Sequence, residues 1–295
     1  MPDQVNTAPA TAPAGDFVLV LSCPDRPGIV YAVSGFLVAH HGNILESQQY
    51  DDPFTGRFFM RIDFVTAAEE SAEALHAGFA AVAAEFDMDF SLWDARAPYR
   101  TIIMVSRYLH CLNDLLFRYS TGALQIDIPV VISNHRDAEA LVRSYGLEFE
   151  HVPVSAATKP AAEQRLLDLV AEAEVDLVVL ARYMQVLSDD LCRELSGRAI
   201  NIHHSFLPSF KGAKPYHQAF DRGVKLVGAT AHYVTAALDE GPIIEQDVIR
   251  VDHAHTQEQL VAAGRDVEAL VLSRAVRWHA ESRVLLNGNR TVVFR

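Results

Sequence analysis

The sequence predicts an α/β protein of two domains: a ferredoxin-like βαββαβ domain, followed by a doubly wound, mostly parallel-sheet domain of Rossmann-like type. The chain has 295 residues, which is long for a single domain. Residues 16–94 place two helical patterns among four strand patterns. Beyond residue 100, apolar strand patterns alternate with amphipathic helical ones, as in repeated βα units.

The elements of the first domain follow from periodicity and turn residues. Residues 1–15 are rich in Pro, Ala and Thr without apolar periodicity, so we expect a disordered segment. Alternating or β-rich residues predict strands at 16–22, 43–50, 57–65 and 88–93. Helical spacing predicts helices at 29–41 and 69–86. Residues 95–100 contain a proline and are expected to link the two domains.

The second domain is expected to span residues 101–295. Apolar runs predict strands at 101–106, 128–133, 147–152, 176–181, 225–234 and 243–251, and another that begins at Ala199. Amphipathic patterns predict helices at 111–119, 137–145, 160–173, 216–222 and 256–281. The segment 284–294 is expected to form a hairpin about Asn287 and Gly288.

Polar residues gather where three of these strands end, at segments 106–111, 182–188 and 201–212. The carboxyl ends of strands are where doubly wound sheets bind ligands. In an extended strand Asn201, His203 and Ser205 project together while Ile202 points inward. An amide donor beside an imidazole suits a carbonyl that becomes an oxyanion, although the same residues could only cap the strand.

Composition excludes several classes of function. The formal net charge of −13 argues against a nucleic-acid-binding protein, which needs a clustered basic face. No apolar run approaches the ~20 residues of a membrane span, and no secretory signal is visible. The three cysteines Cys23, Cys111 and Cys192 are widely separated, which fits a reducing cytoplasm. The histidine spacings match no familiar zinc motif, so we expect no required metal.

The first domain resembles an ACT domain, through its first strand, the turn that opens its first helix, and Gly42, Asn43 and Ile44 at its second strand. The resemblance implies a homo-oligomer and an effector site, commonly for an amino acid, at the turn residues Asp25, Arg26, Pro27, Gly28 and Ile29. Backbone N–H groups at a helix N-terminus suit a carboxylate. The alternative is that the domain serves only to hold subunits together.

The second domain resembles the folate-dependent formyltransferase family over residues 100–285. The motifs are Asn201-Ile-His203, the segment 207–212 and Asp239-Glu-Gly241. The resemblance implies that Asn201, His203 and Asp239 form the catalytic set. It also implies a folate pocket lined, largely by backbone, by Arg182, Tyr183, Met184, Gln185, Val186 and Leu187.

Within that family the chain looks like the hydrolytic members, which carry an N-terminal ACT domain. The segment after the first strand, 106–112, lacks the glycines of a phosphate-binding loop, and the acidic chain lacks a tRNA-binding extension. The implied reaction is hydrolysis of 10-formyltetrahydrofolate to tetrahydrofolate and formate, within one-carbon metabolism and purine biosynthesis, with no cofactor beyond the folate substrate. Asn201 would donate to the oxyanion, and Asp239 would orient or deprotonate the attacking water.

Several alternatives stay open at this point. A transferase that passes the formyl group to a small amine would share every catalytic residue, and a folate-binding regulator would need a broken catalytic set. Ser205 is expected to cap the loop and Cys111 to pack at the start of a helix, while the directions of His110 and His204 are undecided. Two interpretations are equally supported for a further set of residues: they screen the charge of the folate glutamate tail, or they form a solvated surface. The residues are Lys211, Lys214, Tyr216 and His217.

Overall fold

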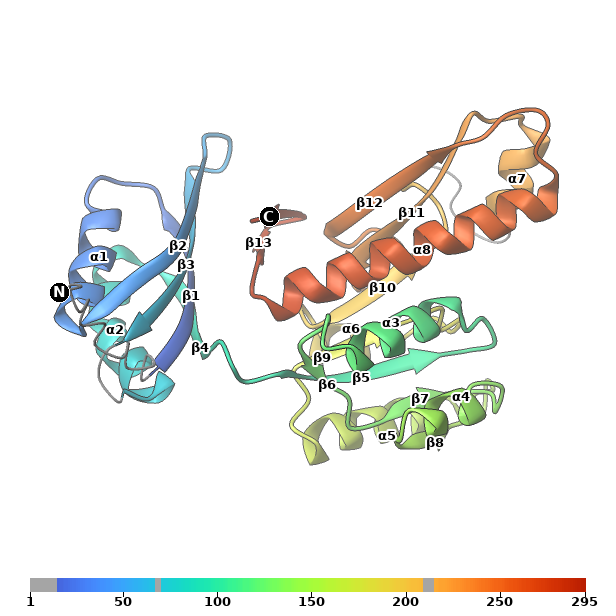
Figure 1. Cartoon of the computed structure of the whole chain (residues 1–295), viewed down its shortest axis with the longest axis horizontal. Coiled ribbons are helices and arrows are strands. Elements are labelled where there is room, and N and C mark those ends of the chain that lie inside the picture. Colours follow the sequence, from blue (N-terminus) through green and yellow to red (C-terminus); the bar gives the residue numbers. More distant parts are fainter. Residues whose placement is uncertain (1–14, 67–69, 209–214) are drawn as a thin grey trace, which may run out of the picture. The chain divides into compact units, whose positions relative to one another are not determined.

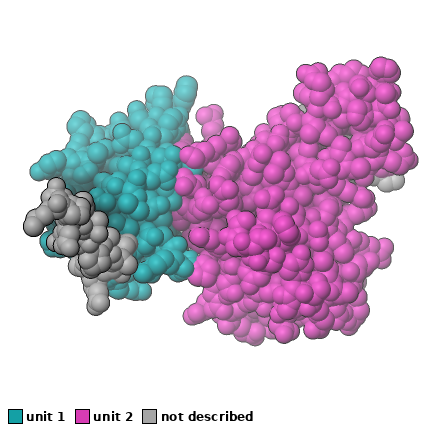
Figure 2. All heavy atoms as spheres, in the orientation of Figure 1, with its two compact units in different colours: residues 1–97, 294 teal, residues 98–293, 295 magenta. Residues whose placement is uncertain are grey.

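A computed structural model describes residues 15–66, 70–208 and 215–295 of the chain (Figure 1). The expected disordered segment therefore lies, except for Gly15, outside the described residues, as do Lys211 and Lys214. The chain divides into two compact units, residues 1–97 with 294 and residues 98–293 with 295 (Figure 2). Among the described helices, none is both long and apolar enough to cross a membrane.

The first unit has the βαββαβ order that the sequence predicts. Its strands are β1 (Gly15–Pro24), β2 (Gly42–Asp52), β3 (Arg57–Thr66) and β4 (Asp89–Asp94), and its helices are α1 (Ile29–Ala39) and α2 (Ala72–Phe86). The four strands form an antiparallel sheet in the order β2-β3-β1-β4. Both helices lie on the same face of this sheet (Figure 1), and apolar side chains such as Phe17, Phe64 and Phe79 fill the core between them.

The second unit contains a larger mixed sheet. Its first strands are β5 (Tyr99–Val105), β6 (Ile126–Asp127), β7 (Val131–Ser133), β8 (Phe149–His151), β9 (Leu177–Leu180) and β10 (Ala199–His203). Two longer strands, β11 (Leu226–Tyr233) and β12 (Ile243–Arg250), complete the order β12-β11-β10-β9-β5-β7-β8, with β6 beside β5. The strands from β8 to β10 are parallel, and β11 and β12 are antiparallel additions. The expected doubly wound, mostly parallel sheet is confirmed.

Helices flank this sheet and a hairpin follows it. The helices are α3 (His110–Ser120), α4 (Glu139–Ser144), α5 (Lys159–Glu172), α6 (Asp189–Glu194), α7 (Pro215–Asp221) and α8 (Gln257–Ala280). The hairpin strands are β13 (Val284–Asn287) and β14 (Arg290–Val293). Helix α8 packs against β10, β11, β12 and α3 (Figure 1). Its residues Val271 and Leu272 belong to a hydrophobic core to which most strands of the sheet contribute.

The structure differs from the sequence-based expectation at several places, among them the short strand β6, which was not expected. Helix α6 was not expected, because its six residues are too few to show a period; its Ser188 N-cap accepts a hydrogen bond from the Leu191 amide. Strands β7 and β8 are shorter than the apolar runs that contain them. Strand β5 begins at Tyr99, inside the expected linker, because Tyr99 and Arg100 pair with Ile126 and Asp127.

Candidate functional site

A cavity of about 510 Å³ lies at the carboxyl ends of β9 and β10. The neighbouring strands β5, β9 and β10 run parallel, so the segments that follow them meet at one edge of the sheet. The loop after β11 and the helix α8 complete the lining. The polar residues in it are Tyr108, His110, Arg182, Tyr183, Gln185, Asn201, His203, His204, Tyr216, His217, His232, Thr235, Asp239, Arg265 and Glu268.

All six residues of the segment 182–187, which sequence reasoning assigns to the folate pocket, line this cavity. The segment is anchored at its start by Ser106, which is buried at the end of β5. The Ser106 hydroxyl donates to Oδ1 of Asn134 at 2.7 Å and accepts from the Met184 amide at 3.0 Å. The Ser106 amide donates to the Arg182 carbonyl. Tertiary contacts therefore set the backbone path of this segment.

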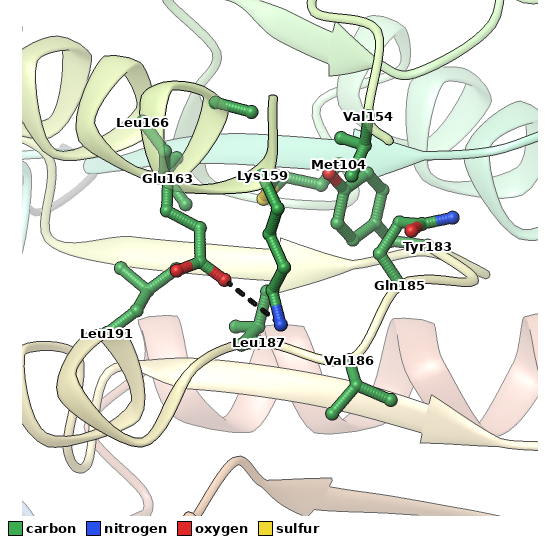
Figure 3. Close-up of a pocket in the computed structure, with 11 residues that line it drawn as sticks. Met104, Val154, Lys159, Glu163, Leu166, Tyr183, Gln185, Val186, Leu187 and Leu191 are labelled. Atoms are coloured by element: carbon green, nitrogen blue, oxygen red, sulfur yellow. Dashed lines mark ion pairs between the residues drawn. The ribbon is translucent and has the colours of Figure 1, made fainter. Parts of the chain in front are cut away.

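A carboxylate from helix α5 anchors the other end of the same segment. Glu163 accepts a hydrogen bond from the Ser188 amide at 2.9 Å, and it also lies 3.8 Å from the Lys159 ammonium. Figure 3 shows this pair beside a narrow apolar pocket, which Tyr183, Val186 and Leu187 of the segment help to line. Burial raises the pKa of Tyr183 to about 12, so its hydroxyl stays protonated at neutral pH.

Asn201 and His203 project from β10 into the cavity, while Ile202 between them is buried in the core. This alternation is the one that the sequence predicts. The antiparallel neighbour β11 places His232 opposite Asn201 and Thr230 opposite His203. The alternation does not extend to Ser205, because the strand ends at His203. Ser205 is buried, and its carbonyl accepts a hydrogen bond from the Thr230 hydroxyl.

Asp239 reaches the site because the loop between β11 and β12 folds back tightly over the end of β11. Its backbone is left-handed, with φ 57°, a conformation that aspartate tolerates better than most residues. A Cβ at Gly241 would come within 1.8 Å of the Tyr233 carbonyl oxygen, so a side chain there would force the loop away. Gly241 is thus required for the close approach that places Asp239 in the cavity.

His203 and Asp239 form a buried polar pair. Nδ1 of His203 lies 3.2 Å from Oδ1 of Asp239, and the exposed fractions of the two side chains are 5% and 12%. The hydrogen bond from His203 holds the pKa of Asp239 below its ordinary value, although burial opposes this. Since Nδ1 faces the carboxylate, the second ring nitrogen, Nε2, is the one free to act. It is buried and has no hydrogen-bond partner among the described residues.

His232 completes this group, and sequence reasoning missed its role. Its Nδ1 lies 2.9 Å from the Tyr233 carbonyl, so Nδ1 carries the proton and donates. Its Nε2 therefore accepts, and the Nδ2 amide of Asn201 donates to it at 3.2 Å. Burial lowers the pKa of His232 and keeps the ring neutral, although the Asp239 carboxylate is 3.8 Å away. The alternation of β11 was the only sequence signal that could have placed His232 on this face.

A second polar group, centred on Glu268 of α8, was also missed because the α8 pattern predicts a mostly apolar inner face. The carboxylate is 1% exposed and contacts His110, Tyr216 and Arg182. His110, Cys111 and Glu268 carry ligand atoms within 4.8 Å of one another, the spacing a metal ion needs. The Glu268 oxygens, however, are already hydrogen-bonded to His110 and Tyr216 and paired with the charge of Arg182. That no metal is required therefore stays a prediction.

The remaining sequence predictions have mixed outcomes. Cys111 is buried in the core as expected, and burial raises the pKa of its thiol well above the ordinary value. His110 and His204, whose directions the sequence leaves undecided, both line the cavity, as does His217. In the first unit, Arg26 donates to the Glu85 carbonyl and lies over the Phe86 ring, and Gly28 caps α1. Effector binding at residues 25–29 stays a prediction.

Comparison with known proteins identifies relatives over nearly the whole chain. Residues 99–276 match the Formyl transferase family. The chain is 58% identical to a formyltetrahydrofolate deformylase of Corynebacterium sp. (strain P-1), over 94% of this chain and 98% of that one. It is 51% identical to the Bacillus subtilis protein of the same name, over 94% and 93%. The crystal structure of a Pseudomonas syringae formyltetrahydrofolate deformylase superposes with a TM-score of 0.93 at 49% identity, over 95% and 94%.

Proposed function

The chain belongs to the formyl transferase family and, within it, to the formyltetrahydrofolate deformylases, and on this premise we propose that Asn201, His203 and Asp239 carry out its reaction. The reaction is hydrolysis of 10-formyltetrahydrofolate to tetrahydrofolate and formate. The observation that carries the assignment is that Asn201, His203 and Asp239 line one cavity, where Nδ1 of His203 lies 3.2 Å from Oδ1 of Asp239.

The formyl oxygen would bind where Asn201 can donate to it. One hydrogen of the Nδ2 amide is held by His232, which leaves the other for the formyl oxygen. When water attacks the formyl carbon, that oxygen becomes an oxyanion, and the donor is already in place when the charge develops. A preorganised donor of this kind typically lowers the barrier by about 3–4 kcal/mol.

His203 and Asp239 would handle the protons. Asp239 remains ionised at neutral pH, so it can accept a proton from the attacking water or stabilise a positive charge on His203. Nε2 of His203 would donate to the oxyanion or carry a proton to the leaving nitrogen. Breaking the bond from the formyl carbon to that nitrogen requires one proton on the nitrogen, and the water supplies it.

The segment 182–187 would hold the pterin ring, largely through its backbone. Two side chains, the buried Ser106 and the half-buried Glu163, fix the path of that segment, so its amide and carbonyl groups are in position before substrate arrives. The carry-over of folate binding to these residues rests on the family resemblance together with their place in the cavity lining.

The direct test is to incubate the purified protein with 10-formyltetrahydrofolate and no amine, and to measure formate and tetrahydrofolate. We expect the two products in equal amounts. The matched variant Asn201→Ala should be slower by about 10²–10³-fold, because it removes one oxyanion donor. Absence of formate from the wild-type protein, or release of tetrahydrofolate only when an amine is added to take the formyl group, would contradict the proposal.

A further inference from the structure

Glu268 is the centre of a group of charged and polar side chains in the cavity that the proposed chemistry does not use. Its Oε1 accepts from the Tyr216 hydroxyl at 2.7 Å, and its Oε2 lies 2.8 Å from Nε2 of His110. Burial alone would raise the pKa of Glu268, but the hydrogen bond from His110 and the charge of Arg182 outweigh it and keep the carboxylate ionised. Four elements thus converge on one buried charge. We call Arg182, His110, Tyr216 and Glu268 the Glu268 cluster.

Two positions have backbone features that allow this cluster to form. Arg182 has φ 65°, in the left-handed region that favours glycine, yet it carries a long side chain whose Nε lies 3.2 Å from Oε2 of Glu268. One turn before Glu268 on α8, a Cβ at Gly264 would come within 2.2 Å of the Tyr216 ring. The absence of a side chain at Gly264 therefore allows Tyr216 to reach the Glu268 carboxylate. Arg182 reaches the same carboxylate from a left-handed backbone conformation that is unfavourable for a residue with a side chain.

The cluster lies beside the proposed catalytic group, with His204 between the two. The His204 ring is centred 5.2 Å from the His203 ring and 6.3 Å from the Tyr216 ring. Burial, together with the charges of Arg182 and His203, lowers the pKa of His204 to about 3, so this ring is neutral. Both groups border the same cavity. The cluster therefore lines the part of the cavity next to the proposed position of the formyl group.

We infer that Arg182 and Glu268 determine the nucleophile, so that the formyl group is passed to water and not to an amine; this inference rests on the proposed hydrolysis. An amine that takes the formyl group must bind beside the formyl carbon. Its N–H groups then need hydrogen-bond acceptors on the protein at that place. The carboxylate that could provide them already accepts from the Tyr216 hydroxyl, is bonded to His110 and is paired with the charge of Arg182. What the cluster presents instead is the Arg182 guanidinium, which can only donate hydrogen bonds and which fills the space, whereas a water molecule needs only Asp239 and His203.

Removing the Arg182 side chain should open a place for an amine. In the transfer reaction the amine nitrogen bonds to the formyl carbon and the bond from that carbon to the folate nitrogen breaks. The folate nitrogen gains one proton and the amine loses one, so no further reactant is needed. The freed Glu268 carboxylate would then accept a hydrogen bond from the incoming amine.

The experiment measures how 10-formyltetrahydrofolate partitions between formate and N-formylhydroxylamine when hydroxylamine is the added nucleophile. We expect the ratio of formylated amine to formate to rise at least ~10-fold over wild type in Arg182→Gly, a substitution that also suits the left-handed backbone. Because a buried carboxylate that has lost its ion pair can prevent folding, Arg182→Gly/Glu268→Gln is the second variant. The same direction is expected, since the side-chain amide oxygen introduced at position 268 can still accept a hydrogen bond from the amine. Arg265→Ala is the matched control: it removes the other cation over the Tyr108 ring without touching Glu268, and its ratio should stay at the wild-type value.

The outcomes separate this inference from the proposed function. If wild type releases formate and the ratio is unchanged in both variants, the hydrolase assignment stands and the role of the cluster is wrong. Loss of both products in variants that still bind folate would also overturn it, because the cluster would then serve the chemistry and not the choice of nucleophile. If wild type itself forms the formylated amine in preference to formate, the proposed function fails first.

Discussion

The Nδ2 amide of Asn201 lies 3.2 Å from Nε2 of His232, and this contact determines which end of the Asn201 side chain faces His232. The Tyr233 carbonyl requires the proton of His232 to sit on Nδ1. Nε2 can then only accept, so the amide nitrogen, and not the amide oxygen, must face it. The consequence is that the amide nitrogen is held in a fixed position, with its second hydrogen left for the proposed bond to the formyl oxygen.

His232→Phe tests this orientation. Without the acceptor, the Asn201 amide can rotate, and we expect kcat to fall by about 10–100-fold with a smaller change in KM, since the lost interaction belongs to the transition state. The matched control is His279→Phe, at a half-buried histidine that contacts the Tyr233 hydroxyl outside the cavity. Both variants should lose stability, and only the first should lose turnover. Equal kcat in the two variants would refute the positioning role.

Asp239→Asn tests the proposed proton acceptor. The amide keeps the shape of the carboxylate but cannot take a proton, so turnover should fall by about 10²–10⁴-fold while folate binding is largely kept. Single-turnover formate release and folate fluorescence titration measure the two effects. The adjacent Glu240→Gln removes one negative charge from the same loop and should leave turnover near the wild-type rate. Near-normal hydrolysis by Asp239→Asn would show that the assignment is wrong.

Ser106→Ala tests the anchoring of the folate segment. The substitution leaves the Met184 backbone amide and the side-chain oxygen Oδ1 of Asn134 without their hydrogen-bond partner. Such a loss typically costs about 1–3 kcal/mol of folding free energy. We expect KM for the folate substrate to rise about 10-fold with a smaller fall in kcat, because the segment loses its position and the catalytic group does not. Ser133→Ala, on the neighbouring strand β7, is the control. A KM effect of equal size in both variants would argue against a specific role for Ser106.

The pH dependence of stability should reveal the buried neutral histidines. Burial lowers the pKa of His279 to about 4 from 6.5. Below pH 6.5 the unfolded chain takes up a proton that the folded protein excludes, so the free energy of unfolding falls as the pH decreases. His279 should account for about 2 kcal/mol of this loss between about pH 7 and about pH 5.

Denaturant unfolding of wild type and His279→Phe at the two pH values measures this contribution. The variant is less stable throughout, because the Tyr233 hydroxyl loses its partner, but its stability should change less with pH. His204 and His232, which are also held neutral by burial, are present in both proteins and cancel in the difference. Parallel pH curves would contradict the buried neutral state of His279.

Much of the site follows from short-range sequence rules. Alternation along β10 is enough to put Asn201 and His203 on one face and Ile202 on the other. The apolar runs that precede residues 106, 182 and 201 are enough to place three polar segments at one edge of a parallel sheet. Those rules also account for the two domains, since the change from a βαββαβ order to repeated βα units is visible in the pattern itself.

The sequence by itself determined the fold class, the strand that carries Asn201 and His203, and the family resemblance that selects Asp239, because periodicity and local motifs act over a few residues. Only the tertiary structure decided that His232 orients Asn201, that Gly241 lets Asp239 reach His203, and that Glu268 gathers Arg182, His110 and Tyr216. Each of those relationships joins elements far apart in the chain. A hydrogen bond between such groups depends on strand register and on close backbone approach, and neither has a local signature in the residues that make it.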